Sequence, residues 1–130
     1  MFKLNRDVKT RDEIIFGKYE SKAYKGGLRR FDNLSLEKLK KLVECKFIRL
    51  EECQNNSPSV REFIEFMEKY SGYTVMGYAI SVKRTDYRVT LDGIEKREIV
   101  YSLDEVDEFE SLFGDADDFD SYNALYAWFD

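Results

Sequence analysis

Apolar residues recur at helical spacing in three stretches of the chain. The first stretch begins after Ser35, and the second begins after Ser59, which has the capping-box spacing to Glu62. The third begins after Ser102, in a second capping-box pattern, and stops before Gly114, a residue type that commonly ends helices. We therefore predict three helices, each with one core-facing side. These sides comprise Leu36, Leu39, Leu42 and Val43 in the helix over 35–44, Val60, Phe63, Ile64, Met67 and Tyr70 in the next helix, and Leu103, Val106, Phe109 and Phe113 in the last.

Between the second and third helices, the pattern changes to that of β-strands. Residues 73–82 are rich in aromatic and β-branched side chains, and residues 87–91 alternate apolar with polar positions. Asp92-Gly93 is a common two-residue hairpin turn. We therefore expect residues 94–101 to return as a further antiparallel strand.

The two ends of the chain complete the predicted fold. Residues 122–129 have the aromatic-rich composition of a closing strand, whereas residues 1–33 form a basic segment that we expect to be irregular apart from a short strand at 14–16. The elements then follow the order α-α-β-β-(β)-α-β, which is typical of the α+β class. We predict a single domain over residues 1–130, with a small antiparallel sheet of three to four strands and about three helices packed on one face.

Charge is distributed unevenly along the chain. The formal net charge is −5, but residues 1–50 carry +7, residues 51–100 carry −2, and residues 101–130 carry −10 with no Lys or Arg. Folding either brings the two ends together and neutralises these charges, or leaves two faces of opposite sign. In the second case the acidic, aromatic C-terminal region is a candidate interaction face for a protein partner or a second copy of the chain. Its residues are Asp107, Glu108, Glu110, Asp117, Asp118 and Asp120.

The segment 16–31 interleaves aromatic with basic residues and forms a candidate basic patch. The basic residues are Lys18, Lys22, Lys25, Arg29 and Arg30. Aromatic rings stack on bases while cations contact phosphates, so nucleic-acid binding is an alternative function, although the net negative charge weighs against it. A further alternative is that the acidic region imitates nucleic acid toward a DNA-binding protein.

The residue inventory excludes several kinds of enzyme. The chain has no His, which removes Ser-His nucleophiles, His general bases and most zinc sites. No glycine-rich phosphate loop is present, and the acidic run 115–120 has Phe119 and Asp120 where a calcium loop needs an acid or Asn and then Gly. We therefore predict a non-enzymatic protein with no catalytic residue, no cofactor and no metal.

The compartment is indicated by what the sequence lacks. The N-terminus has no apolar signal core, and no window approaches the roughly 18 apolar residues that a membrane span requires. Cys45 and Cys53 do not form a disulfide framework in a chain of this size. We expect a cytoplasmic protein with free thiols and no membrane contact.

Residues 55–130 also carry a recognisable pattern. It comprises Asn56-Ser57-Pro58, the helical Glu62-Phe63-Ile64-Glu65-Phe66-Met67, Gly77-Tyr78-Ala79-Ile80-Ser81, Asp86-Tyr87-Arg88-Val89 and the ending Leu125-Tyr126-Ala127-Trp128-Phe129-Asp130. In these features the chain resembles a group of small uncharacterised proteins encoded by phages and mobile elements of Gram-positive bacteria. The resemblance implies a bacterial or phage setting and a non-enzymatic accessory role, and it assigns no functional residue. Together with the charge distribution, it favours protein–protein interaction through the acidic C-terminal region.

Overall fold

The computed structural model describes residues 1–98 and 100–130 of the chain. The helices are α1 (Val8–Phe16), η1 (Ser21–Ala23, a 3-10 helix), α2 (Leu36–Glu44), α3 (Val60–Lys69) and α4 (Leu103–Phe113). The strands are β1 (Leu28–Leu34), β2 (Thr74–Ile80), β3 (Val89–Lys96), β4 (Asp118–Asp120) and β5 (Leu125–Trp128).

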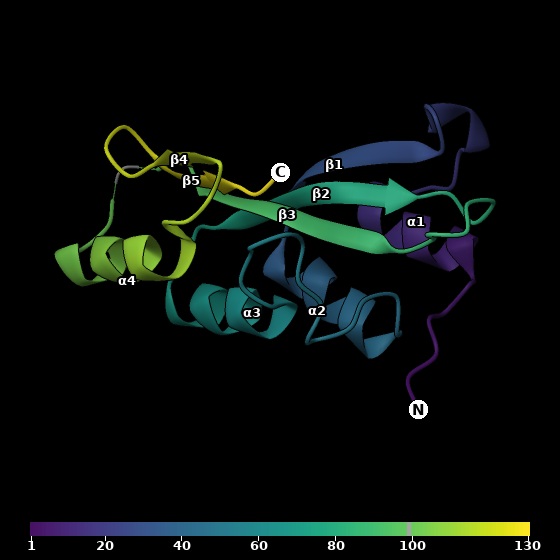
Figure 1. Cartoon of the computed structure of the whole chain (residues 1–130), viewed down its shortest axis with the longest axis horizontal. Coiled ribbons are helices and arrows are strands. Elements are labelled where there is room, and N and C mark those ends of the chain that lie inside the picture. The colour runs from purple at the N-terminus through teal and green to yellow at the C-terminus, as the bar shows by residue number, and fades with distance from the viewer. Residues whose placement is uncertain (99) are drawn as a thin grey trace.

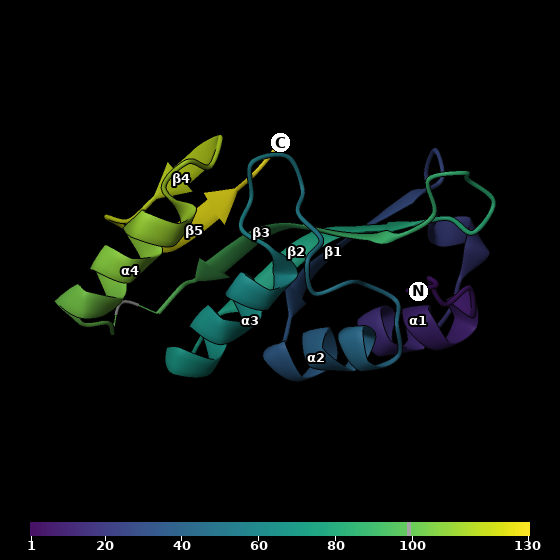
Figure 2. The same cartoon turned by 60° about the horizontal axis from the view of Figure 1, so that its bottom comes forward.

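The strands form one antiparallel sheet in the order β1-β2-β3-β5-β4. Figures 1 and 2 show α1, α2, α3 and α4 on one side of this sheet, and none of these four helices lies on its other face. The predicted α+β class is confirmed. The described residues contain more elements than predicted, with four α-helices and a five-stranded sheet in place of about three helices and three to four strands.

The predicted starts of α2, α3 and α4 are confirmed because each depends on a local serine cap. The hydroxyl groups of Ser35, Ser59 and Ser102 each accept a hydrogen bond from the backbone N–H three residues later. At Ser59 the backbone N–H donates in return to the carboxylate of Glu62, which completes the capping box. At Ser102 the predicted box is incomplete, since the carboxylate of Glu105 faces the interior instead. Among the described residues, no helix has both the length and the apolar character needed to cross a membrane.

The N-terminal segment, expected to be irregular apart from a short strand, contains α1, η1 and the start of β1. Residues 14–16 end helix α1 and do not form a strand, and the side chain of Asp7 caps this helix by accepting from the Thr10 N–H. Arg11 and Asp12 occupy buried positions of α1 and are fully inaccessible to solvent. Because a polar pair stands where apolar residues are usual, the sequence of α1 lacks the periodic apolar pattern of a helix.

The buried Arg11–Asp12 pair also fixes the segments around it. The Nε of Arg11 donates to the Asp12 carboxylate at 2.9 Å, and the Nη1 of Arg11 donates to the carbonyl oxygen of Ile80 at the end of β2, also at 2.9 Å. Its Nη2 donates to the Tyr24 hydroxyl at 2.7 Å, and that hydroxyl donates to Asp12. Every charge in this cluster is therefore paired, which is the condition for burying it.

Asp92 and Gly93 do not form the predicted hairpin turn. Both lie inside β3, where one extra residue opposite β2 produces a bulge as the register shifts between Met76 and Gly77. A Cβ atom on Gly93 would lie 2.7 Å from the carbonyl oxygen of Ala127. The glycine thus allows the close approach of β5 and does not serve a turn.

The other strand predictions have mixed outcomes. β2 lies within the predicted strand 73–82, and β5 lies within 122–129. The predicted separate strand over 94–101 is wrong, because β3 continues through to Lys96. The connection between β2 and β3 lies at residues 81–88, which includes the gap between the predicted strands 73–82 and 87–91.

The core lies between the sheet and the helices, and an aromatic cluster joins α3 to α4. The ring of Phe66 contacts those of Tyr73, Phe109 and Phe113 with centroid separations of 4.9, 5.9 and 5.3 Å. Phe63 contacts Phe113 at 5.1 Å. Tilted and edge-on aromatic pairs at these separations are favourable, so the two helices are held side by side.

Candidate functional site

Helix α4 carries the largest part of the acidic C-terminal region and is oriented by a few inward residues. Phe109 and Phe113 are fully buried, as predicted. Leu103, predicted to face the core, is instead 83% exposed. Glu105 is buried instead, so the inward side of α4 includes a carboxylate that the apolar pattern alone does not reveal.

The carboxylate of Glu105 links α4 to the sheet. Its Oε2 accepts from the Nζ of Lys96 in β3 at 2.9 Å and from the hydroxyl of Tyr73 at 2.7 Å. The side chains of Lys96 and Glu105 are 6% and 7% exposed, so this ion pair is shielded from water. Burial, with the hydrogen bond to Glu105, raises the pKa of Tyr73 far above its usual value, which keeps its hydroxyl a donor. The arrangement fixes where α4 presents its outer side chains.

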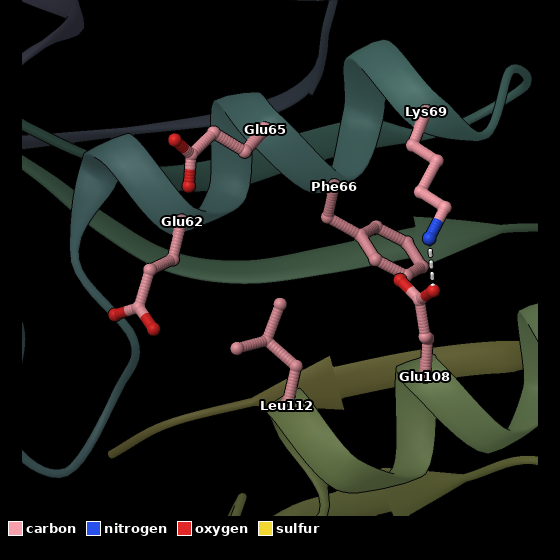
Figure 3. A pocket seen from close by; sticks show the side chains of 6 residues that line it. All are labelled: Glu62, Glu65, Phe66, Lys69, Glu108 and Leu112. Atoms are coloured by element: carbon pink, nitrogen blue, oxygen red, sulfur yellow. Dashed lines mark hydrogen bonds and ion pairs between the residues drawn. The ribbon is translucent and has the colours of Figure 1, made fainter.

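A groove runs between α3 and α4, as Figure 3 shows. We call it the α3–α4 groove; its walls are Glu62, Glu65, Phe66 and Lys69 from α3 with Glu108 and Leu112 from α4. Phe66 is buried at its base, and Leu112 points from α4 toward α3 in Figure 3. Its volume is about 230 Å³. That is below the roughly 300–1,000 Å³ usual for small-molecule sites, so the groove suits one or two side chains of a partner.

One end of the groove is closed by an ion pair across the two helices. The Nζ of Lys69 donates to a carboxylate oxygen of Glu108, and the hydroxyl of Tyr70 donates to the same oxygen at 3.1 Å. The hydrogen bond from Lys69 holds the pKa of Glu108 below its ordinary value, and the same bond raises the pKa of Lys69. Both side chains are about half exposed, at 44% for Glu108 and 59% for Lys69. Ion pairs this exposed contribute little to stability, so a ligand can displace this one at small cost.

The groove combines negative charge with an apolar base. Glu65 is exposed on α3, and Glu62 uses its carboxylate to cap the same helix. Three carboxylates line the groove together with Phe66 and Leu112, and among the described lining residues Lys69 is the single cation. Such a site accepts a cationic group on an aliphatic stem, because the stem covers the apolar base while the charge reaches the carboxylates.

The six acidic residues predicted as an interaction face are spread over α4, the loop after it and β4. Only Glu108 lines the groove, while Asp107 is exposed on α4 and Asp118 is exposed on β4. The other three have local partners that the sequence did not reveal. Glu110 accepts from the Ser121 hydroxyl, Asp117 accepts from the Asp130 N–H, and Asp120 accepts from the N–H groups of Tyr122 and Asn123.

The predicted basic patch is divided because its two arginines alternate along β1. Arg29 lies on the helix side, with its guanidinium 3.6 Å from the ring centre of Phe16, whereas Arg30 lies on the open face, 4.4 Å from the ring centre of Trp128. Lys18 pairs with Glu20 at 3.0 Å. The remaining two predicted basic residues, Lys22 and Lys25, are exposed near the turn before β1.

The basic turn before β1 and the acidic helix α4 are separated in the fold (Figure 1). Within residues 1–98 and 100–130, no ion pair joins the basic first 50 residues to the acidic residues after 100. Figure 1 shows α1 and the turn before β1 at one end of the sheet and α4 at the other. The basic turn before β1 and the acidic helix α4 thus lie at opposite ends of the sheet (Figure 1), while Arg30 of the basic region contacts the ring of Trp128.

The α3 side of the groove was not anticipated from the sequence. Phe66 stands outside the predicted core-facing side of its helix, and it is nevertheless buried. An apolar residue beside a complete apolar face indicates that a second element packs there. Phe66 was therefore the signal in the sequence that could have predicted the contact with another helix. Glu62 and Glu65, one helical turn apart, then stand at the edge of that second contact.

Comparisons with known proteins give no match: no family model, no curated protein and no solved structure is similar to this chain at a significant level.

Proposed function

We propose that this protein acts by protein–protein interaction, binding a positively charged segment of a partner through the α3–α4 groove. The observation that carries the proposal is the combination of three carboxylates with the apolar base formed by Phe66 and Leu112. The role proposed is binding without catalysis.

The recognition step follows from the Lys69–Glu108 ion pair. An arginine of the partner replaces Lys69 beside Glu108 and forms the paired hydrogen bonds that a guanidinium makes with a carboxylate. Lys69 then swings into solvent, at little cost for so exposed a pair. Because Phe66 and Leu112 lie beside that carboxylate, an aliphatic residue next to the arginine adds apolar contact.

The charge of the C-terminal region supports the same partner chemistry. Residues 101–130 carry −10 with no cation, which attracts a basic surface over a range of about 10 Å at 0.1 M salt. Fields of this kind increase association rates more than final affinity. A basic, DNA-binding protein is one kind of partner with the required charge.

The proposal is tested with a short amphipathic helical peptide that carries Arg on one side and Leu on the other. We expect the backbone NMR signals of Phe66 and Leu112 to shift on titration, with affinity that decreases as salt increases. The double variant Glu65→Gln/Glu108→Gln is expected to bind several-fold more weakly. Glu13→Gln in α1 removes the same type of charge from an exposed position away from the groove and should bind as the unmodified protein does.

Equal binding by the double variant would refute the proposal, as would NMR shifts confined to other parts of the molecule. Circular dichroism of each variant, measured first, separates loss of the groove from loss of the fold.

A further inference from the structure

A second cavity lies at the opposite end of the sheet from α4. It is formed between the segment 19–27, which contains η1, and the start of the loop that follows β2 at residues 81–84. In Figure 1 both segments lie beside the end of β2 that is remote from α4. The cavity volume is about 360 Å³. This is larger than the α3–α4 groove and within the roughly 300–1,000 Å³ range of small-ligand sites.

One wall of the cavity is a tight turn that is fixed to the loop. Gly26 and Gly27 have φ angles of +62° and +80°, as a two-residue reversal requires. The N–H of Ser81 donates to the Gly27 carbonyl oxygen at 2.8 Å, and Arg84 Nη1 donates to that of Gly26 at 3.0 Å. A Cβ atom on Gly27 would lie 2.4 Å from Cδ of Arg84, so the glycine is what lets the arginine cross the turn. The wall is therefore in place before any ligand arrives.

The lining of this cavity has the chemistry of an anion site. None of the described side chains that line it is acidic, and two of them, Lys83 and Arg84, are cations. Asp86 accepts from Arg84 Nε and Nη2 at 2.8 Å each, which holds the guanidinium in one orientation. In the part of the chain that the structure describes, the Nζ of Lys83 has no ion-pair partner.

Hydroxyl groups supply neutral donors to the same cavity. Ser81 accepts from the Lys83 N–H through its Oγ, which leaves its own O–H free to donate. Ser21 and the half-buried Tyr19 also line the cavity and add two more hydroxyls. Tyr24, in contrast, already donates to Asp12 and accepts from Arg11, so it serves as a fixed wall.

Cations outside the cavity also favour the binding of an anion in it. Lys22 and Lys25 are exposed on the segment that forms one wall, and Arg6 donates to the carbonyl oxygen of Val82 in the opposite wall at 2.9 Å. Tetrahedral phosphate oxygens accept several hydrogen bonds at once, which matches a cavity with two cations and three hydroxyls. The planar ring of Tyr19 adds a surface on which a base can stack.

We propose that this cavity binds a phosphate-bearing ligand, with Lys83 and Arg84 as the cationic contacts and Ser21 and Ser81 as hydroxyl donors. The phosphate belongs either to a small molecule such as a mononucleotide or to one position of a single-stranded nucleic acid. The proposal does not depend on the function proposed for the α3–α4 groove, which lies at the other end of the molecule.

The test is an NMR titration of the whole chain with inorganic phosphate, adenosine monophosphate, uncharged adenosine and a single-stranded DNA oligonucleotide. We expect phosphate and the mononucleotide to shift the backbone signals of Gly26, Gly27 and Ser81, and adenosine to leave them unchanged. Binding of the mononucleotide without the oligonucleotide assigns the site to a small molecule. Tighter, strongly salt-dependent binding of the oligonucleotide, with shifts that extend to Lys22, assigns it to a strand.

The variant Lys83→Glu should weaken binding of phosphate about tenfold or more, the scale of a charge-assisted hydrogen bond. Lys38→Glu makes the same charge change on an exposed position of α2 and should leave binding unchanged. Equal loss in both variants would show that only the overall charge matters and would overturn the proposal. Failure of every phosphate-bearing probe to shift the three backbone signals would overturn it as well.

Discussion

Replacing Glu105 by Gln tests how firmly the buried ion pair holds α4 against the sheet. The substitution keeps the shape of the side chain but removes its charge. The side chain of Lys96, which is only 6% exposed, then has no carboxylate beside its ammonium group. Lys96 then has a weak amide acceptor in place of a carboxylate at 2.9 Å. The hydroxyl of Tyr73 loses its charged acceptor in the same step.

The magnitude follows from this geometry. Removing one partner of a buried, hydrogen-bonded ion pair costs about 3–5 kcal/mol, because the other charge stays buried and uncompensated. A domain of this size has a free energy of unfolding of about 5–15 kcal/mol. A loss of 1 kcal/mol lowers the melting temperature of a 130-residue domain by about 3–5 °C, so Glu105→Gln should melt roughly 10–25 °C lower.

The assay is urea and thermal unfolding followed by circular dichroism, with Asp107→Asn on the exposed side of α4 as the matched control. We expect the control to stay within about 0.5 kcal/mol of the unmodified protein. The double variant Lys96→Met/Glu105→Leu removes both charges and should recover most of the loss. A loss below about 1 kcal/mol for Glu105→Gln would refute the reasoning, since the pair would then behave as an exposed one.

Three further outcomes are expected. Cys45 and Cys53 are both free thiols, so titration of protein purified without reductant should count two groups, and a count of zero would contradict the structure. Burial raises the pKa of Asp92, so the folded protein binds this proton more tightly than the unfolded chain and loses stability as pH rises above the ordinary carboxyl pKa of about 4. Asp92→Asn should therefore raise the melting temperature at pH 7 and have less effect at pH 4, whereas an equal effect at both pH values would exclude this origin. Gly77→Ala should lower the urea midpoint by the equivalent of about 1–3 kcal/mol or more, because the new Cβ would lie 1.9 Å from the Thr90 carbonyl oxygen, and an unchanged midpoint would show that β3 moves freely.

Features set by neighbouring residues could be predicted from the sequence. The serine caps of α2, α3 and α4 act over three residues, and the apolar sides of α2 and α3 follow directly from helical spacing. Features set by distant contacts could not. Leu103 fits the apolar spacing of α4 but lies in solvent. The position that turns inward is Glu105, which pairs with Lys96 in β3.

In the N-terminal third, too, the structure depends on a contact between residues far apart in the sequence. Ile14-Ile15-Phe16 has strand composition, but its conformation depends on Arg11, which bonds to Ile80 in a distant strand. The α3–α4 groove is a harder case still, since it exists only when two helices far apart in sequence pack together. Of its three acidic residues, only Glu108 was predicted to belong to an interaction face, and the pairing of Glu108 with Lys69 required the fold.

The short β4 strand limits how the sheet can grow. β4 forms one edge of the sheet, is three residues long, and carries Asp118 and Asp120 around a single Phe119. Unpaired edge strands are templates on which strands of other molecules add, and charge and shortness are the usual means of preventing this. If two copies met edge to edge through β4, carboxylates would face carboxylates across the new ladder, which is unfavourable while they are ionised. Asp118 and Asp120 thus act against fibrillar growth from this edge of the sheet.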